Sequence, residues 1–352
     1  MIKIITNVFY RRTTVTSTIS TDDDKFRFSY YGGTDSPVFD WRKSSFSKPT
    51  SDPSLLAKKS GMRISVKEKM NALINQDVVS KLAIFGDIYI SFSTIPQELL
   101  QNQYYFKLKI TNHELIKQVV PNPNYVVKQD TDKENEYTCN LTALLSFASQ
   151  NINTSVAILK YQINIDDDQK SKYLPIFVNP IWKSEPTTLS LLLVYQLNTL
   201  QYKLISASEL RFFVSLYGDI RGVQLKPHGI WNSEKKRLIW KDDRVLKYGS
   251  SISLKEGSNE NLNADDNAKS LDGSTESLKS SDILGTRKLM ARFETGEQCP
   301  YGNINVQFSC DSLVSTVEVN TESDEMLTNL MDLENISYNT VIKYIINNNN
   351  NK

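Results

Sequence analysis

Few residues in this chain could carry out chemistry on their own. The sequence has only two histidines, His113 and His228, and neither lies near a cysteine or an acidic residue at a spacing suited to metal ligation. The run Asp166–Asp168 lacks the alternating ligands and the glycine of a calcium loop, so a solvated turn is the simpler interpretation. Hydrolase, P-loop and zinc-protease motifs are absent from the sequence. We therefore expect no enzyme, no cofactor and no metal site; an enzyme assembled from distant residues is the weakest alternative.

Three tryptophans stand beside charged or polar residues. Lys183 follows Trp182, Asn232 follows Trp231, and Lys241 follows Trp240. Large aromatic side chains dominate burial energetics, so each tryptophan is first interpreted as a core or strand-edge anchor. The alternative is a surface hot spot, in which tryptophan and lysine together grip a peptide.

These motifs and neighbouring basic positions supply the candidate partner-binding residues. The candidates are Lys160, Trp182, Lys183, Glu185, Lys226, Arg237 and Lys241. By strand alternation Lys160, Lys183, Glu185 and Lys241 should face solvent when their aromatic neighbours face inward. An ordinary solvated strand position is the alternative for each. Such basic residues could also contact an anionic membrane, where each is worth about 1 kcal/mol.

The elements that must position these residues are mostly strands. Apolar and polar residues alternate at 88–92, 106–110, 157–165, 304–308 and 317–319. The aliphatic run Leu189–Tyr195 also has strand length, and Met70–Ile74 fits either a helix or a strand. Leu141–Ser149 has helical spacing, with Asn140 as the N-cap. Many strands, few helices and no internal repeat favour β-sandwich architecture.

Length and composition exclude several classes of protein. The 352 residues include 41 Lys and Arg against 40 Asp and Glu, which argues against a surface built as a whole for nucleic acid. Cys139, Cys299 and Cys310 form no CxxC pair, so we expect neither a disulfide framework nor structural zinc, and a reducing compartment. No stretch approaches the roughly 20 apolar residues that span a bilayer.

Polar segments flank and interrupt the patterned region. Residues 1–63 are predicted to be a low-order tail, although their aromatic islands could form a linear peptide for a partner. Residues 251–282 are predicted to be a disordered loop between strands, and 347–352 an Asn-rich tail.

Six short motifs, in order, resemble the mu-homology domain of muniscins, the C-terminal part of the FCHo proteins and of the yeast suppressor of profilin deletion. They are Phe85–Phe92, Ile158–Gln162, Trp182–Pro186, Ile230–Asn232 with Trp240-Lys241, Ala291–Glu294, and Asn305–Phe308. The resemblance covers about 64 to 346. The chain lacks the heptad-rich helices of the F-BAR domain that whole muniscins carry.

The resemblance implies an all-β, elongated mu-homology domain of two β-sandwich subdomains, the second inserted into the first. Subdomain A would hold 64–172 and 312–346, and subdomain B 173–311. In related adaptor medium chains an aspartate and a tryptophan grip tyrosine-based sorting peptides. Those positions fall near Ile64 and Tyr344, so the needed carboxylate is missing and such a pocket is not expected.

The resemblance also implies a function. Family members are endocytic adaptors, so the expected partners are an EH-domain scaffold protein and transmembrane cargo tails, with an anionic membrane surface as a further candidate and no nucleic acid. The expected location is cytoplasmic, at plasma-membrane endocytic sites of the cell cortex or bud neck. The alternative is a medium-chain-like subunit of a vesicle coat complex, against which the lack of an N-terminal longin-like domain counts.

Overall fold

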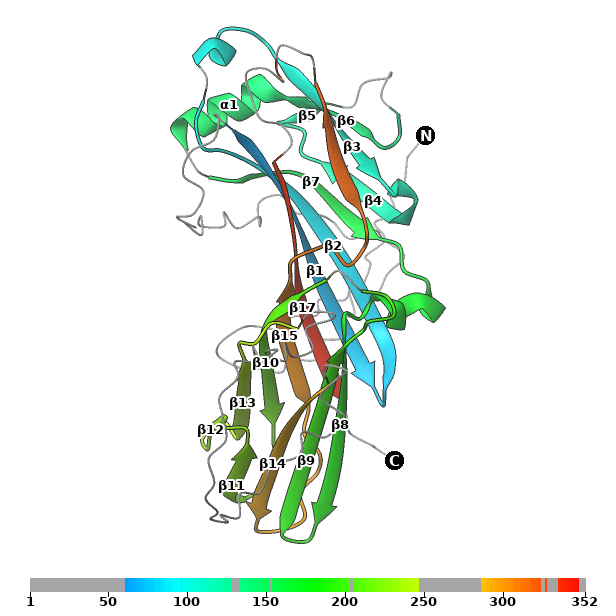
Figure 1. Cartoon of the computed structure of the whole chain (residues 1–352), viewed down its shortest axis with the longest axis vertical. Coiled ribbons are helices and arrows are strands. Elements are labelled where there is room, and N and C mark those ends of the chain that lie inside the picture. Colours follow the sequence, from blue (N-terminus) through cyan, green and yellow to red (C-terminus); the bar gives the residue numbers. More distant parts are fainter. Residues whose placement is uncertain are drawn as a thin grey trace, which may run out of the picture. The chain divides into compact units, whose positions relative to one another are not determined.

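The computed structural model describes residues 61–95, 97–127, 133–151, 154–202, 205–246, 286–323, 327 and 335–347. Within these ranges the protein is an all-β structure of three sheets, with an α-helix at Leu141–Gln150 (Figure 1). None of the helices in these ranges is long and apolar enough to cross a membrane.

The largest sheet has nine strands. In spatial order they are β12 (Ile230–Asn232), β13 (Arg237–Asp242), β10 (Ala207–Ser215), β15 (Ile304–Cys310), β17 (Ile336–Asn347), β1 (Met62–Asn75), β2 (Val78–Phe92), β7 (Val156–Ile163) and β4 (Ile116–Pro121). Only β1 and β17 pair in parallel, with Ile64 opposite Ile336 and Asn75 opposite Asn347; the other pairs are antiparallel. The centre of this sheet therefore joins the two ends of the described chain.

Two four-stranded sheets complete the fold. One consists of β11 (Ile220–Lys226), β14 (Arg287–Thr295), β9 (Thr188–Leu197) and β8 (Ile176–Glu185). The other consists of β16 (Glu318–Glu322), β3 (Tyr105–Thr111), β6 (Glu136–Asn140) and β5 (Val126–Val127). The helices are α1 (Leu141–Gln150) and three short 3-10 helices at Gln97–Leu100, His113–Leu115 and Asp167–Tyr173.

The sheet β11-β14-β9-β8 packs face to face on part of the nine-stranded sheet. The ring of Tyr195 on β9 lies 4.7 Å from that of Phe212 on β10, and Phe293 on β14 lies 5.9 Å from Trp231 on β12, measured between centroids. Aromatic pairs of this kind fill the space between two sheets. The outer faces of the two sheets consequently point away from each other.

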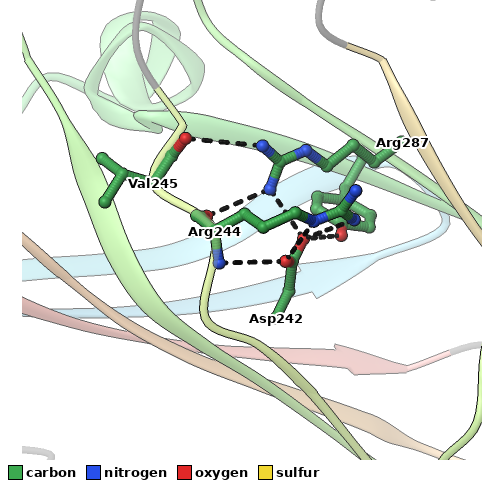
Figure 2. A network of polar contacts seen from close by, with 5 residues as sticks. Asp242, Arg244, Val245 and Arg287 are labelled. Atoms are coloured by element: carbon green, nitrogen blue, oxygen red, sulfur yellow. Dashed lines mark hydrogen bonds and ion pairs between the residues drawn. The ribbon is translucent and has the colours of Figure 1, made fainter.

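A buried carboxylate ties these two sheets together. Asp242 on β13 accepts a hydrogen bond of 2.5 Å from the Tyr195 hydroxyl and one of 2.7 Å from Arg287 on β14 (Figure 2). Arg244 donates to both Asp242 oxygens, and Arg287 also reaches the carbonyls of Arg244 and Val245. Burial alone would raise the pKa of Asp242, but hydrogen bonds from Arg244, Tyr195 and Arg287 outweigh it and lower the pKa to about 2.

A second buried carboxylate fixes the segment that leads into β16. Glu68 on β1 is fully buried and accepts hydrogen bonds from the Tyr161 hydroxyl at 3.0 Å, the Val314 amide at 3.0 Å and the Ser315 hydroxyl. Burial raises the pKa of this carboxyl group, although the hydrogen bonds from Ser315 and Tyr161 oppose the shift. Because no cation pairs with Glu68 among the described residues, only its hydrogen bonds oppose the cost of burying the charge, and they offset that cost in part.

The strands expected from alternation are confirmed, except that β7 ends at Ile163 rather than at residue 165 and β16 begins at Glu318 rather than at residue 317. In β3, Phe106, Leu108 and Ile110 are buried, and in β15 the same holds for Ile304 and Val306. The segment 70–74 is part of β1, and the run 189–195 lies in β9. The helix is also confirmed: the side chain of the expected N-cap residue accepts a hydrogen bond from the Ala143 amide.

The predicted division into subdomains stays a prediction. The nine-stranded sheet takes strands from both 64–172 and 173–311, so that boundary does not coincide with a sheet boundary. Strand β1 begins at Met62, two residues before the expected start. The expected loop 251–282 and nearly all of the two expected tails lie outside the described residues.

Candidate functional site

The outer face of the sheet β11-β14-β9-β8 carries a mixed apolar and basic surface, which we call the β9 face. Each of the four strands contributes its outward side chains. Those of β8 are Phe177, Asn179, Ile181, Lys183 and Glu185, and those of β9 are every second residue from Thr188 to Gln196. Those of β14 are Lys288, Met290, Arg292 and Glu294, and those of β11 are Gln224 and Lys226. The inward residues of β9, from Leu189 to Leu197, are buried. Leu192 and Val194 thus place aliphatic side chains on the open side of a strand whose other side is already core.

Strand register arranges this face in rows. Ile181, Leu192, Met290 and Lys226 lie opposite one another across the four strands. Neighbouring strands are about 4.8 Å apart, so the three apolar side chains adjoin and the lysine ends the row. Ile181 is 51% and Met290 42% exposed, a large fraction for apolar side chains in the middle of a domain face.

The next row brings positive charge beside the apolar one. It contains Lys183, Ser190, Arg292 and Gln224. Lys183 and Arg292 therefore flank the apolar row, and Lys226 closes its end. Together these residues line an open hollow of about 540 Å³.

The two acidic groups of the β9 face lie at one end, in the row next to the turn between β8 and β9. Glu185 forms an ion pair of 2.7 Å with Lys183. The hydrogen bond and the charge of Lys183 hold the pKa of Glu185 below its usual value, with a smaller contribution from Arg292. Glu294 lies over Gly222, where an added Cβ would approach the carboxylate to 2.7 Å. Four cations against two carboxylates leave this face positive.

Three predicted site residues meet on the β9 face, namely Lys183, Glu185 and Lys226. Trp182 points the other way, where it stacks on Tyr301 with the ring centroids 5.7 Å apart. Trp182 therefore supports the sheet from beneath, as the core-anchor interpretation expects. Trp240 is buried as well, and its indole donates to the Pro227 carbonyl at 3.1 Å.

The other predicted residues lie on the nine-stranded sheet. Arg237 and Lys241 are on the outer side of β13. The expectation that Lys160 faces solvent is wrong: only 12% of its side chain is exposed, and its ammonium group lies 3.6 Å from Asp87. The reason is that β7 is an interior strand between β2 and β4, so neighbouring side chains cover Lys160 on both sides.

Sequence reasoning missed Lys288, Met290 and Arg292. The signal that could have found them is the run Leu189–Tyr195, which is apolar on both strand faces and therefore predicts that its outer side is also partly apolar. Arg292 even lies within a motif that carried the family resemblance, but nothing in the sequence alone shows that β14 pairs with β9.

Neither histidine lies in a cluster of described residues that could act together in catalysis or metal binding. The hydroxyl of Tyr137 lies 3.5 Å from Nε2 of His113, and His228 lines a small hollow beside the edge strand β11 with Arg221 and Trp231. Over the described ranges no group of His, Cys, Asp and Glu residues could hold a metal ion. Asp167, from the acidic run, pairs with Lys170 at 2.8 Å at the start of a 3-10 helix. The arrangement of apolar and basic side chains on the β9 face suits binding of a partner.

Known proteins resemble this chain in sequence and in fold. Over 194 residues the chain is 26% identical to F-BAR domain only protein 2 of Mus musculus, covering 51% of this chain and 24% of that protein. The chain thus matches about a quarter of the length of that relative. The structure resembles the Danio rerio Fcho1 mu homology domain solved with a bound Eps15 peptide, with a TM-score of 0.57 and 17% identity over 82% of this chain and 97% of the other.

The yeast delta-COP-I mu-homology domain is a more remote neighbour, with a TM-score of 0.49 and 12% identity over 83% of this chain and 100% of the other. Residues 60–262, more than half of the chain, match the family described as the muniscin C-terminal mu homology domain. This family is an adaptor-like protein-binding domain. The chain therefore belongs to the muniscin C-terminal mu homology domain family.

Proposed function

We propose that this domain is an adaptor module of early clathrin-mediated endocytosis that binds an EH-domain scaffold protein and the tails of transmembrane cargo. The observation that carries the proposal is membership of the muniscin family over residues 60–262. The fold shared with an Fcho1 domain solved with an Eps15 peptide supports peptide binding as the mode of interaction. The domain acts at the plasma membrane, at the cell cortex or the bud neck, from the cytoplasmic side.

The β9 face is the surface on which we place the scaffold peptide. Its apolar row, Ile181, Leu192 and Met290, suits a large aromatic or aliphatic side chain. Lys226 and Arg292 beside that row suit acidic residues of the same peptide. An extended segment of about six residues spans roughly 20 Å, enough to cross all four strands. The partner predicted by this chemistry is a short acidic segment with at least one bulky apolar residue.

Binding by a scaffold peptide tests the function and the site together. Isothermal titration calorimetry with an Eps15-type scaffold peptide should give measurable affinity for the wild-type domain. The double variant Lys226→Glu with Arg292→Glu should weaken this affinity more than about tenfold, because negative charges would then face the acidic residues of the peptide. The matched control is Arg211→Glu with Lys241→Glu, two exposed cations of the nine-stranded sheet. Absence of any scaffold binding by the wild type would overturn the function, and equal losses in both variants would overturn the site.

Localisation and binding partners in the cell provide a second test. A fluorescent fusion should collect in cortical patches together with early coat proteins, and pull-downs should recover the scaffold in substoichiometric amounts. Stoichiometric co-purification with large adaptin-type chains would instead identify a permanent coat subunit. That result would reverse the assignment in favour of the medium-chain alternative.

A further inference from the structure

The outer face of the nine-stranded sheet carries a second cationic surface, which we call the β10 face. It consists of Arg211 on β10, Arg237 and Lys241 on β13, and Lys343 on β17, around the apolar side chains Ile230, Ile239, Phe213 and Ile345. This face is independent of the peptide surface, since the inner sides of the two sheets pack against each other through Tyr195 and Phe212.

Strand register places the cations in a two-dimensional array. Lys241, Arg211 and Lys343 belong to one row that crosses β13, β10, β15 and β17, with Gln307 between the last two cations. At about 4.8 Å per strand this row is roughly 14 Å long. Arg237 lies four residues from Lys241 along β13, a separation of about 13 Å. The charges therefore spread in two directions.

No carboxylate interrupts these rows. The neighbouring row contains Ile230, Ile239, Phe213, Asn305 and Ile345, and Arg237 lies opposite Ser215 and Asn232. Asp242 points inward to its arginines, and Glu209 lies at a bulge near the start of β10. Among the described residues, Arg211, Arg237 and Lys241 have no acidic partner within ion-pair distance.

We propose that the β10 face docks on the anionic surface of a lipid bilayer. An extended acidic peptide follows a line and would meet only one row of cations, whereas a leaflet offers negative charge in two dimensions. The long basic side chains can lay their aliphatic stems over Phe213 and Ile239 and extend their charges to the phosphates. Ile230, which is 53% exposed, is placed to enter the interfacial region.

Docking through this face leaves the β9 face directed away from the membrane. A domain held in this way can bind lipid and a scaffold peptide at the same time, without competition between them. The formal charge of the whole chain is only +1, so attraction of the chain as a whole to an anionic vesicle is weak, and binding must come from a local array.

Vesicle cosedimentation tests the proposal. The domain should sediment with phosphatidylcholine vesicles that contain about 20 mol% phosphatidylserine, should not sediment with pure phosphatidylcholine, and should be released as salt rises from about 0.1 to about 0.5 M. Arg211→Gln with Lys241→Gln should lower the partition coefficient about 25-fold, because each cation near an anionic leaflet is worth about fivefold in affinity. Thermal melting should show that both side chains can be replaced without loss of the fold.

The matched control carries Lys226→Gln and Arg292→Gln on the opposite face, and its vesicle binding should stay within about twofold of the wild type. Sedimentation that does not depend on phosphatidylserine, or a larger loss in the control than in the β10-face variant, would overturn the proposal. If Arg211→Gln with Lys241→Gln weakens scaffold-peptide binding and spares vesicle binding, the β10 face is a protein site and the membrane assignment is wrong. Failure of scaffold binding in every variant would count against the proposed function and would leave the membrane proposal unaffected.

Discussion

Replacing Asp242 by asparagine should remove most of the polar link between the two sheets that carry the β9 and β10 faces. A carboxyl group whose pKa falls from 3.8 to about 2 on folding stabilises the folded state at pH 7 by about 2 kcal/mol, since a tenfold change in an equilibrium constant is worth about 1.4 kcal/mol. Because the folded pKa is depressed, this stabilisation is complete well above pH 4 and is lost as the pH falls toward 2. At pH 3 about 1 kcal/mol should remain.

The assay is urea denaturation of the wild type and of Asp242→Asn at pH 7, 5, 4 and 3. The free-energy difference between the two proteins should be about 2 kcal/mol at pH 7 and should shrink by about half at pH 3. Asp243→Asn is the matched control, because Asp243 is the next residue, is exposed and should change stability by less than about 0.5 kcal/mol. A difference for Asp242→Asn that stays constant with pH, or that equals the control, would refute this account of the network.

Substitutions at three further positions test buried parts of the fold. Glu68→Gln should gain stability relative to the wild type as pH rises above about 4.5, because burial raises the Glu68 pKa and its ionisation then costs the folded state free energy; denaturation at pH 4.5 and 7.5 measures the change. Gly86→Ala should cost about 3 kcal/mol or more in a thermal melt, since the new Cβ would overlap the buried ring of Tyr161, and an unchanged melting temperature would contradict the packing. Trp182→Phe should change stability by less than about 1 kcal/mol, because the indole N–H has no hydrogen-bond partner among the described residues. Trp182→Ala also loses the stack on Tyr301 and should cost about 3 kcal/mol; urea denaturation measures both changes.

Local patterns in the sequence were sufficient to predict several of the strands, among them those at 88–92, 106–110 and 304–308, and the helix. Alternation is a property of neighbouring residues, so Phe106 and Leu108 could be assigned to the core without knowledge of the partner strands. Alternation puts Tyr89 on the side away from Ile88 and Ile90, but it did not predict that Tyr89 is buried on that side as well. A register shift between β2 and β7 falls between Ile88 and Tyr89, and the Tyr89 hydroxyl donates to Asp87. A bulge of this kind depends on the partner strand and leaves no mark in the strand's own sequence.

The candidate site was predictable only in part, for a similar reason. Lys183 and Glu185 share a strand, so their common face follows from spacing alone. Lys226 joins them only because β14 lies between β11 and β9, and Arg292 comes from the far side of a long polar segment. Lys160 has the same local pattern as Lys183, yet its strand is interior and Asp87 covers it. Strand order is set by contacts between distant residues, which a single sequence does not display.

The position of β17 has a consequence for synthesis. It is the last of the described strands along the chain, and it lies between β15 and β1 in the middle of the nine-stranded sheet. Until the ribosome releases it, the nascent domain has two long unpaired strand edges, and such edges readily pair with other chains. The domain should therefore need chaperone protection until β17 has left the ribosome. A stop codon before Ile336 would remove β17 and divide the sheet at its centre, so the loss of this strand should abolish folding.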